Sequence, residues 1–174
     1  PVANAISEDG TEEEPEIDAS LPTLLLVEDN KDLCQLIKLQ LEDKFNIHIA
    51  NNGVEGLKKV HLYHPDIVVT DQMMPEMDGL EMLQSIRKDF QISHIPVIIL
   101  TAKGNDEAKT KAISMGANAY IIKPFSKDYL VARIEQLLNE RKLFRERVWQ
   151  QPEEHKEEQD TYEQFLVKKD VQFI

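Results

Sequence analysis

The hydrophobic positions of the chain fall into five short runs separated by longer segments of mixed character. The runs occupy residues 24–27, 45–50, 67–69, 95–100 and 119–122. Several are unbroken stretches of Leu, Ile and Val, which are typical of strands buried on both faces of a sheet. The segments between them repeat apolar residues every three to four positions, which predicts amphipathic helices. Five strands alternating with five helices indicate an α/β domain with a parallel sheet and helices on both of its faces.

Particular residues mark the core face or the ends of three predicted helices. Four aliphatic residues after the first strand recur at helical spacing on one face: Leu33, Leu36, Ile37 and Leu41. Cys34 lies beside this face, where we interpret it as a small core residue. Gly116 is well placed to end the fourth helix in a left-handed conformation. Ser126 can cap the fifth helix.

The fifth helix is predicted to continue beyond the domain. Its apolar residues keep a 3–4 spacing, interrupted at Arg141: Leu130, Ile134, Leu137, Phe144 and Val148. This spacing resembles a short coiled-coil seam, so a homodimer is one interpretation, although firm assignment needs about three to four heptads. A helix that packs its first half on the sheet and then overhangs is the other. Pro152 should end the helix.

Charge divides the 174 residues into a nearly neutral body and two acidic ends. The formal net charge is −12, and residues 1–22 contain seven acids and no bases. We therefore expect an acidic linker over 1–22, a folded domain over 23–140, and a helical extension with a truncated linker over 141–174. Without a basic stripe, direct nucleic-acid binding by this fragment is not expected.

Two further absences narrow the class of protein. No apolar run approaches the roughly 18 residues that a membrane span needs, so no membrane contact is expected. The single cysteine excludes an internal disulfide bond and fits a reducing compartment. We therefore expect a cytoplasmic protein.

Polar residues stand where the predicted strands end, and these residues are the candidate site. Glu28 and Asp29 follow the first strand, Asp71 the third, Thr101 the fourth and Lys123 the fifth. In a parallel sheet these positions share one rim, where ligands bind. Three carboxylates there repel one another unless a cation such as Mg²⁺ joins them, since Mg²⁺ prefers oxygen ligands and phosphate. With the lysine and the hydroxyl, they indicate phosphoryl transfer with Asp71 as nucleophile.

Each of these residues also has a plain structural interpretation. Asp71 could serve a turn, Thr101 could cap a helix, Lys123 could be a surface lysine, and Tyr120 could be a core aromatic residue. The motifs decide between the interpretations because they occur together and in order. They are LLLVEDN at 24–30, DIVVTDQMMPEMDG at 66–79, VIILTA at 97–102 and AYIIKPF at 119–125.

Residues 23–140, with these motifs, resemble a receiver domain of bacterial two-component response regulators. The resemblance implies a flavodoxin-like, doubly wound (βα)5 fold with strand order 2-1-3-4-5. It implies that Asp71 is the phosphoacceptor and that Mg²⁺ is held by Glu28, Asp29, Asp71 and the backbone carbonyl of Met73. Asp29 is expected to bind the ion directly and Glu28 through water.

The resemblance also assigns the remaining roles. Thr101 is the expected switch hydroxyl, Tyr120 the switch aromatic residue and Lys123 the partner of the phosphoryl group. The bond between Lys123 and Pro124 is expected to be cis. On phosphorylation Thr101 should turn toward the phosphoryl group and Tyr120 should move inward. The face formed by the fourth helix, fifth strand and fifth helix should then be remodelled.

The implied partners are a histidine kinase phosphodonor domain, in cis or in trans, and a downstream output domain. The flanks are similar to the join between a receiver and an AraC-type helix-turn-helix domain, so the full-length protein could be a hybrid histidine kinase that controls transcription. The fragment itself is then no enzyme but an autocatalytic phosphoacceptor.

Two alternatives remain open. A phosphatase similar to haloacid dehalogenases would also use a strand-end Asp, but that family places a second Asp where this chain has Met73. A receiver-like module that binds partners without phosphorylation usually lacks an acidic or lysine position, and none is missing here.

Overall fold

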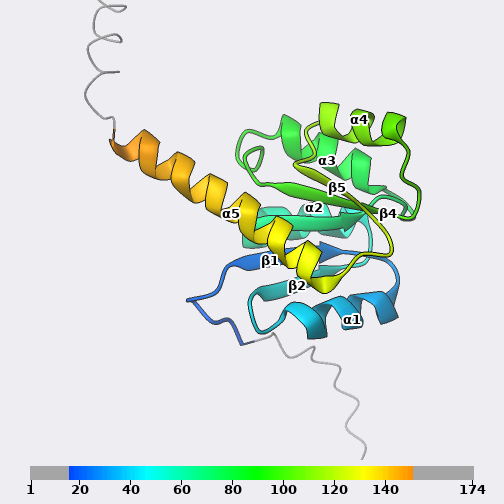
Figure 1. The fold of residues 1–174 in the computed structure, drawn as a ribbon, viewed down its shortest axis with the longest axis horizontal. Coiled ribbons are helices and arrows are strands. Elements are labelled where there is room, and N and C mark those ends of the chain that lie inside the picture. Colours follow the sequence, from blue (N-terminus) through cyan, green and yellow to red (C-terminus); the bar gives the residue numbers. More distant parts are fainter. Residues whose placement is uncertain (1–15, 151–174) are drawn as a thin grey trace, which may run out of the picture.

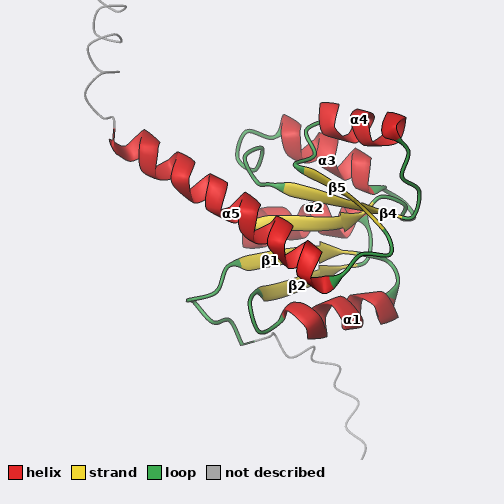
Figure 2. Ribbon diagram, in the orientation of Figure 1, coloured by secondary structure: helices red, strands yellow, loops and turns green. Residues whose placement is uncertain are grey.

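A computed structural model of the protein describes residues 16–150. Within this range five strands alternate with five helices, as Figures 1 and 2 show. The elements are β1 (Thr23–Val27), α1 (Lys31–Leu41), β2 (Asn46–Ala50), α2 (Gly53–Tyr63), β3 (Ile67–Asp71), α3 (Gly79–Lys88), β4 (Val97–Thr101), α4 (Asp106–Ser114), β5 (Ala119–Ile122) and α5 (Lys127–Gln150). All strand pairs are parallel, and their order β2-β1-β3-β4-β5 confirms the predicted topology.

The sheet separates two hydrophobic cores. One core joins the sheet to α1 and α5, and the other joins it to α2, α3 and α4. Successive residues of β3 illustrate the division, because Ile67 and Val69 enter the first core and Val68 enters the second. Every residue of β3 and β4 is buried, as expected for central strands covered on both faces.

The predicted core face of α1 is wrong at one position. Leu36 is 52% exposed, whereas Cys34 is buried and shares the core face with Ile37 and Leu41. The spacing 34, 37, 41 defines the arc that meets the sheet, and Leu36 lies about 100° around the helix from Ile37. Cys34 is small, so a prediction based on the spacing of large apolar residues placed Leu36 on the core face instead.

Local signals at the helix ends match the structure closely. The side chains of four residues each accept a hydrogen bond from a backbone N–H in the first turn of the helix that follows: Asn30, Asn52, Asp78 and Asn105. Ser126 does the same for α5, accepting from the N–H of Tyr129 at 3.1 Å. Gly116, with φ of 102°, follows α4 in the region that favours glycine, as predicted.

Helix α5 begins at the same rim as the strand ends, crosses the sheet and projects past its opposite side (Figure 1). Its first half contributes Leu130, Ile134 and Leu137 to the core. Beyond them Phe144 is 68% exposed and Trp149 80% exposed. The helix therefore overhangs the domain. Its predicted end at Pro152 lies outside the described residues, as does the pattern at 161–174.

The described part of the expected N-terminal linker contacts the sheet. The Asn46 side chain at the start of β2 donates to the carbonyls of Asp18 and Leu21 and accepts from the N–H of Asp18. The Asp18 carboxylate also accepts a hydrogen bond from the N–H of Ser20, which closes a turn. None of the helices described here is long and apolar enough to cross a membrane.

Candidate phosphoacceptor site

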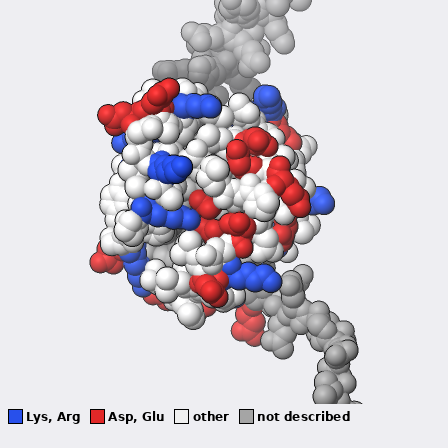
Figure 3. All heavy atoms as spheres, turned by 90° about the vertical axis from the view of Figure 1, so that its right-hand side faces the viewer, with Lys and Arg blue, Asp and Glu red and all other residues white. Residues whose placement is uncertain are grey.

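The predicted site residues come from four different strands and meet at one rim of the sheet. Asp71 and Thr101 are the last residues of β3 and β4, while Glu28 follows β1 and Lys123 follows β5. Figure 3 looks onto this rim and shows acidic side chains gathered near its middle with lysine and arginine around them. The parallel topology thus brings together residues separated by up to 95 positions.

Asp71 is held at this rim by its backbone neighbours. The N–H of Gln72 donates to the carbonyl of Leu100 at 2.8 Å, and the N–H of Gly79 donates to the carbonyl of Gln72 at 2.9 Å. A Cβ atom on Gly79 would stand 2.2 Å from the Asp71 carbonyl oxygen, so only glycine allows α3 to begin this close to the strand. Asp71 itself is 9% exposed.

Three carboxylates converge on one point. Glu28, Asp29 and Asp71 each place an oxygen so that these atoms lie within 4.8 Å of one another. Glu28 is only 2% exposed, and this burial raises the pKa of its carboxyl group, although the hydrogen bond from Lys123 opposes the rise. Carboxylates in such proximity are stable as anions only when cations compensate them.

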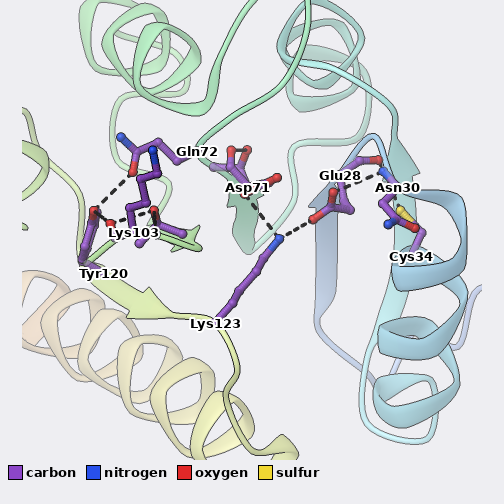
Figure 4. Close-up of polar contacts among 10 residues, drawn as sticks. Glu28, Asn30, Cys34, Asp71, Gln72, Lys103, Tyr120 and Lys123 are labelled. Atoms are coloured by element: carbon purple, nitrogen blue, oxygen red, sulfur yellow. Dashed lines mark hydrogen bonds and ion pairs between the residues drawn. The ribbon is translucent and has the colours of Figure 1, made fainter. Parts of the chain in front are cut away.

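Lys123 supplies one such cation. Its Nζ lies 2.9 Å from Glu28 Oε2 and 3.4 Å from Asp71 Oδ1 (Figure 4). Partial burial would lower the pKa of the ammonium group, but the hydrogen bond and charge of Glu28, together with the charge of Asp71, raise it overall. The peptide bond between Lys123 and Pro124 is cis, as predicted.

The donor set suits a magnesium ion. Three carboxylates and one ammonium leave two negative charges uncompensated, which equals the charge of one divalent cation. Mg²⁺ binds oxygens at about 2.0–2.1 Å in an octahedron, so opposite ligands lie about 4 Å apart, a span compatible with the observed cluster. The ligand expected from Met73 is the backbone carbonyl oxygen. The Met73 side chain is exposed.

Thr101 and Tyr120 meet at the backbone of Lys103. The Thr101 hydroxyl donates to the Lys103 carbonyl at 3.1 Å and accepts from the Lys103 N–H at 3.2 Å. The Tyr120 hydroxyl lies 3.0 Å from the same carbonyl and 3.2 Å from Oε1 of Gln72 (Figure 4). The hydroxyl of Thr101 is therefore directed at the β4–α4 loop.

Tyr120 lies in the hydrophobic core that joins the sheet to α2, α3 and α4. The residue is 8% exposed, and its expected movement on phosphorylation stays a prediction. Sequence reasoning missed Gln72 and Lys103, which hold the hydroxyl. Gln72 directly follows Asp71, but Lys103 acts through its backbone, and no side-chain pattern could have identified it.

The fold and the rim define a doubly wound α/β domain of the receiver type, with an acidic cluster, a hydroxyl and a lysine at the carboxyl ends of its strands. Comparison with known families agrees, since the sequence profile of the response regulator receiver domain matches residues 24–135. The chain belongs to this family, whose members serve as phosphoacceptors in two-component signalling.

Its relatives include both hybrid kinases and regulators. The chain is 40% identical over 121 residues to "Hybrid signal transduction histidine kinase D" of Dictyostelium discoideum, covering 70% of this chain and 8% of that protein. It is 40% identical over 116 residues to "Probable transcriptional regulator ycf29" of Pyropia yezoensis, covering 66% of this chain and 52% of that protein. The chain therefore spans only part of the relatives it matches.

Solved structures agree with the fold. The receiver domain of the Francisella response regulator 1452 superposes with a TM-score of 0.65 at 35% identity, covering 68% of this chain and 98% of that one.

Proposed function

We propose that this domain accepts a phosphoryl group on Asp71 in a magnesium-dependent transfer from a kinase phosphohistidine. The observation that carries the proposal is the convergence of Glu28, Asp29 and Asp71 with Lys123 at one rim. Glu28, Asp29, Asp71 and the Met73 carbonyl would hold the ion. When bound, Mg²⁺ supplies positive charge beside the phosphoryl oxygens.

The transfer forms one bond and breaks one. A carboxylate oxygen of Asp71 attacks phosphorus, a P–O bond forms, and the P–N bond to the donor histidine breaks. Its electron pair returns to the imidazole nitrogen, which then binds a proton. Lys123 already contacts the Asp71 carboxylate, so its ammonium group can follow the negative charge onto a phosphoryl oxygen.

The phosphoryl group changes the charge at the rim and thereby biases the packing. It brings roughly two negative charges and new acceptor oxygens. The Thr101 hydroxyl then leaves Lys103 and donates to a phosphoryl oxygen, which releases one contact of the β4–α4 loop. The surface formed by α4, β5 and α5 responds as a population shift between two packings.

Helix α5 is the proposed route to the output. It starts beside Lys123, belongs to the responding surface, and projects beyond the opposite side of the sheet (Figure 1). We propose a kinase phosphodonor domain, in cis or in trans, as the upstream partner. The proposed downstream partner is a transcriptional output domain, in the AraC-type arrangement that the flanking sequence resembles.

The alternative of a phosphorylation-independent binding module has a specific weakness. It does not explain why three carboxylates and a lysine converge on one point of the rim. A phosphatase similar to haloacid dehalogenases would need a second acid where Met73 stands.

The proposal is tested with acetyl phosphate and Mg²⁺, read by intact mass. The wild-type chain should gain one phosphoryl group, Asp71→Asn should gain none, and Asp43→Asn, an exposed carboxylate outside the rim, should behave as wild type. Uptake by Asp71→Asn would disprove the assignment, and uptake without divalent cation would disprove the role of the metal. Sustained release of phosphate from a small ester would favour the phosphatase.

A further inference from the structure

The Tyr120 hydroxyl contacts the Lys103 carbonyl and the Gln72 amide, and of these two groups only the Lys103 carbonyl also contacts Thr101. The Lys103 carbonyl accepts from both hydroxyls, at 3.0 Å from Tyr120 and 3.1 Å from Thr101. A carbonyl oxygen has two lone pairs and can accept both at once. The second group is the Gln72 amide, 3.2 Å from the Tyr120 hydroxyl and 48 positions away in sequence.

The Gln72 backbone is fixed on both sides, so its side chain has a defined origin. Its N–H extends the pairing of β3 with β4, and its carbonyl accepts from the first residue of α3. Side chains alternate across a strand, so Gln72 points away from the face that presents Asp71. The amide reaches Tyr120 in the core beneath α4 (Figure 4).

Gln72 can remain a partner of the hydroxyl while the Lys103 contact changes. The tyrosine hydroxyl has one proton, and the Lys103 carbonyl can only accept it. The Gln72 amide can accept through its oxygen or, after half a rotation, donate through its NH2 group to a lone pair of the hydroxyl. Neither arrangement depends on where the Thr101 hydroxyl points.

We propose that Gln72 is a positioning residue of the switch, holding Tyr120 inward by a contact that does not pass through Thr101. The proposal rests on the proposed function, because Thr101 and Tyr120 form a switch only if Asp71 accepts a phosphoryl group. Its consequence is that loss of the Lys103 contact alone does not release the ring, because the Gln72 contact remains.

The test is a double-mutant cycle on the 174-residue chain without metal or phosphodonor, read by hydrogen exchange of the β4–α4 loop. Gln72→Met keeps the length of the side chain and removes its hydrogen bond. We expect exchange of the loop amides to rise roughly two- to tenfold, the scale of one neutral hydrogen bond. Tyr120→Phe should also raise it, and adding Gln72→Met to Tyr120→Phe should raise it no further. Gln91→Met, an exposed glutamine in another loop, is the matched control and should leave exchange unchanged.

Three results would overturn the proposal: unchanged exchange in Gln72→Met, an equal rise from Gln72→Met in the Tyr120→Phe background, or an equal rise in Gln91→Met. If Gln72→Met fails to fold by circular dichroism, Tyr120→Phe decides alone, because unchanged exchange there excludes a role for the hydroxyl. Adding acetyl phosphate and Mg²⁺ to wild type tests the proposed function separately. A wild-type chain that gains no phosphoryl group would disprove that function and leave the exchange result standing.

Discussion

Glu28 shows at the scale of one residue how function and stability oppose each other. Its side chain is almost completely buried, and burial raises the pKa of the carboxyl group despite the ammonium of Lys123 at 2.9 Å. A raised folded-state pKa means that the folded protein binds this proton more tightly than the unfolded chain. The stability contributed by Glu28 is therefore fully present below the unfolded pKa and is lost as pH rises through the folded pKa.

The Glu28→Gln variant should accordingly be more stable than wild type near pH 7.5 without metal, by about 1 kcal/mol, as is common when a destabilised functional site is relieved. The gap should shrink toward about pH 4, where the wild-type carboxyl is protonated. Urea unfolding at several pH values measures it, with Asp43→Asn as the surface control. A less stable Glu28→Gln at pH 7.5 would mean that pairing with Lys123 outweighs the cost of burial.

Residue identities could be predicted where chemistry and strand ends coincide. Asp71, Thr101 and Lys123 were recognisable because each reactive side chain stands within two residues of the end of an apolar run. Gln72 was not, because its partner is 48 positions away and an amide beside an aspartate is an ordinary loop residue. Contacts made by a backbone carbonyl, such as that of Lys103, leave no trace in side-chain composition.

At the scale of elements, the junction of β3 with α3 sets the position of Asp71. Gly79 opens α3 against the Asp71 carbonyl, and the helix is capped by Asp78, whose side chain accepts from the N–H of Glu81 at 2.8 Å. The helix periods were predictable, whereas the exact core arcs were not. A small residue such as Cys34 can lie on the buried face of a helix without adding to the spacing of large apolar residues from which that face is predicted.

Gly79→Ala should destabilise the domain by about 1–3 kcal/mol, the usual cost of overpacking, because its Cβ would clash with backbone. Gly56→Ala is the matched control. The nearest atom there is Met82 Sδ at 2.8 Å, part of a flexible side chain, so a smaller loss is expected. Chemical denaturation of both variants gives the comparison, and equal losses would refute the proposed close approach at Gly79.

A hydrogen bond joins helix α5 to the residue that precedes β3. The Arg141 guanidinium donates to the Asp66 carbonyl at 2.9 Å, at the point where the helix leaves the domain. Since β3 also carries Asp71 at its other end, this contact fixes the direction of the proposed output helix relative to the strand of the phosphoacceptor.

Arg141→Ala should raise hydrogen exchange in the second half of α5 and reduce stability by about 1 kcal/mol, the value of a partly exposed hydrogen bond. Arg145→Ala, one turn further along, removes a guanidinium for which the structure shows no hydrogen bond among the described residues, and it should change exchange less. Equal effects of the two variants would show that Arg141 acts only through charge or helix propensity.

At the scale of the whole molecule, the domain holds its acidic site at one rim and sends a largely exposed helix past the other. Nearly neutral charge in the body and acidic ends were evident from sequence. The extent of the overhang depended on where the sheet stops, which periodicity along one helix cannot reveal. The predicted homodimer through this overhang stays a prediction.

Trp149, the only tryptophan of the chain, reports on that prediction. It is 80% exposed, so its fluorescence should be readily quenched by acrylamide at low protein concentration. If the overhang forms a seam between two copies, quenching should weaken as concentration rises, and Phe144→Asp should abolish this protection. Quenching independent of concentration from micromolar to millimolar chain would exclude a dimer through this helix.

The most direct measurement of the central claim is chemical identification of the phosphorylated residue after transfer from a phosphorylated histidine kinase. Borohydride reduces an aspartyl phosphate to homoserine, which peptide mass spectrometry locates. Homoserine at position 71 alone, formed only with Mg²⁺ and absent from Asp71→Asn, is the predicted result. Homoserine at Glu28's neighbour Asp29, or stable phosphate on a hydroxyl or histidine side chain instead, would contradict the assignment of this rim as a phosphoacceptor site built around Asp71.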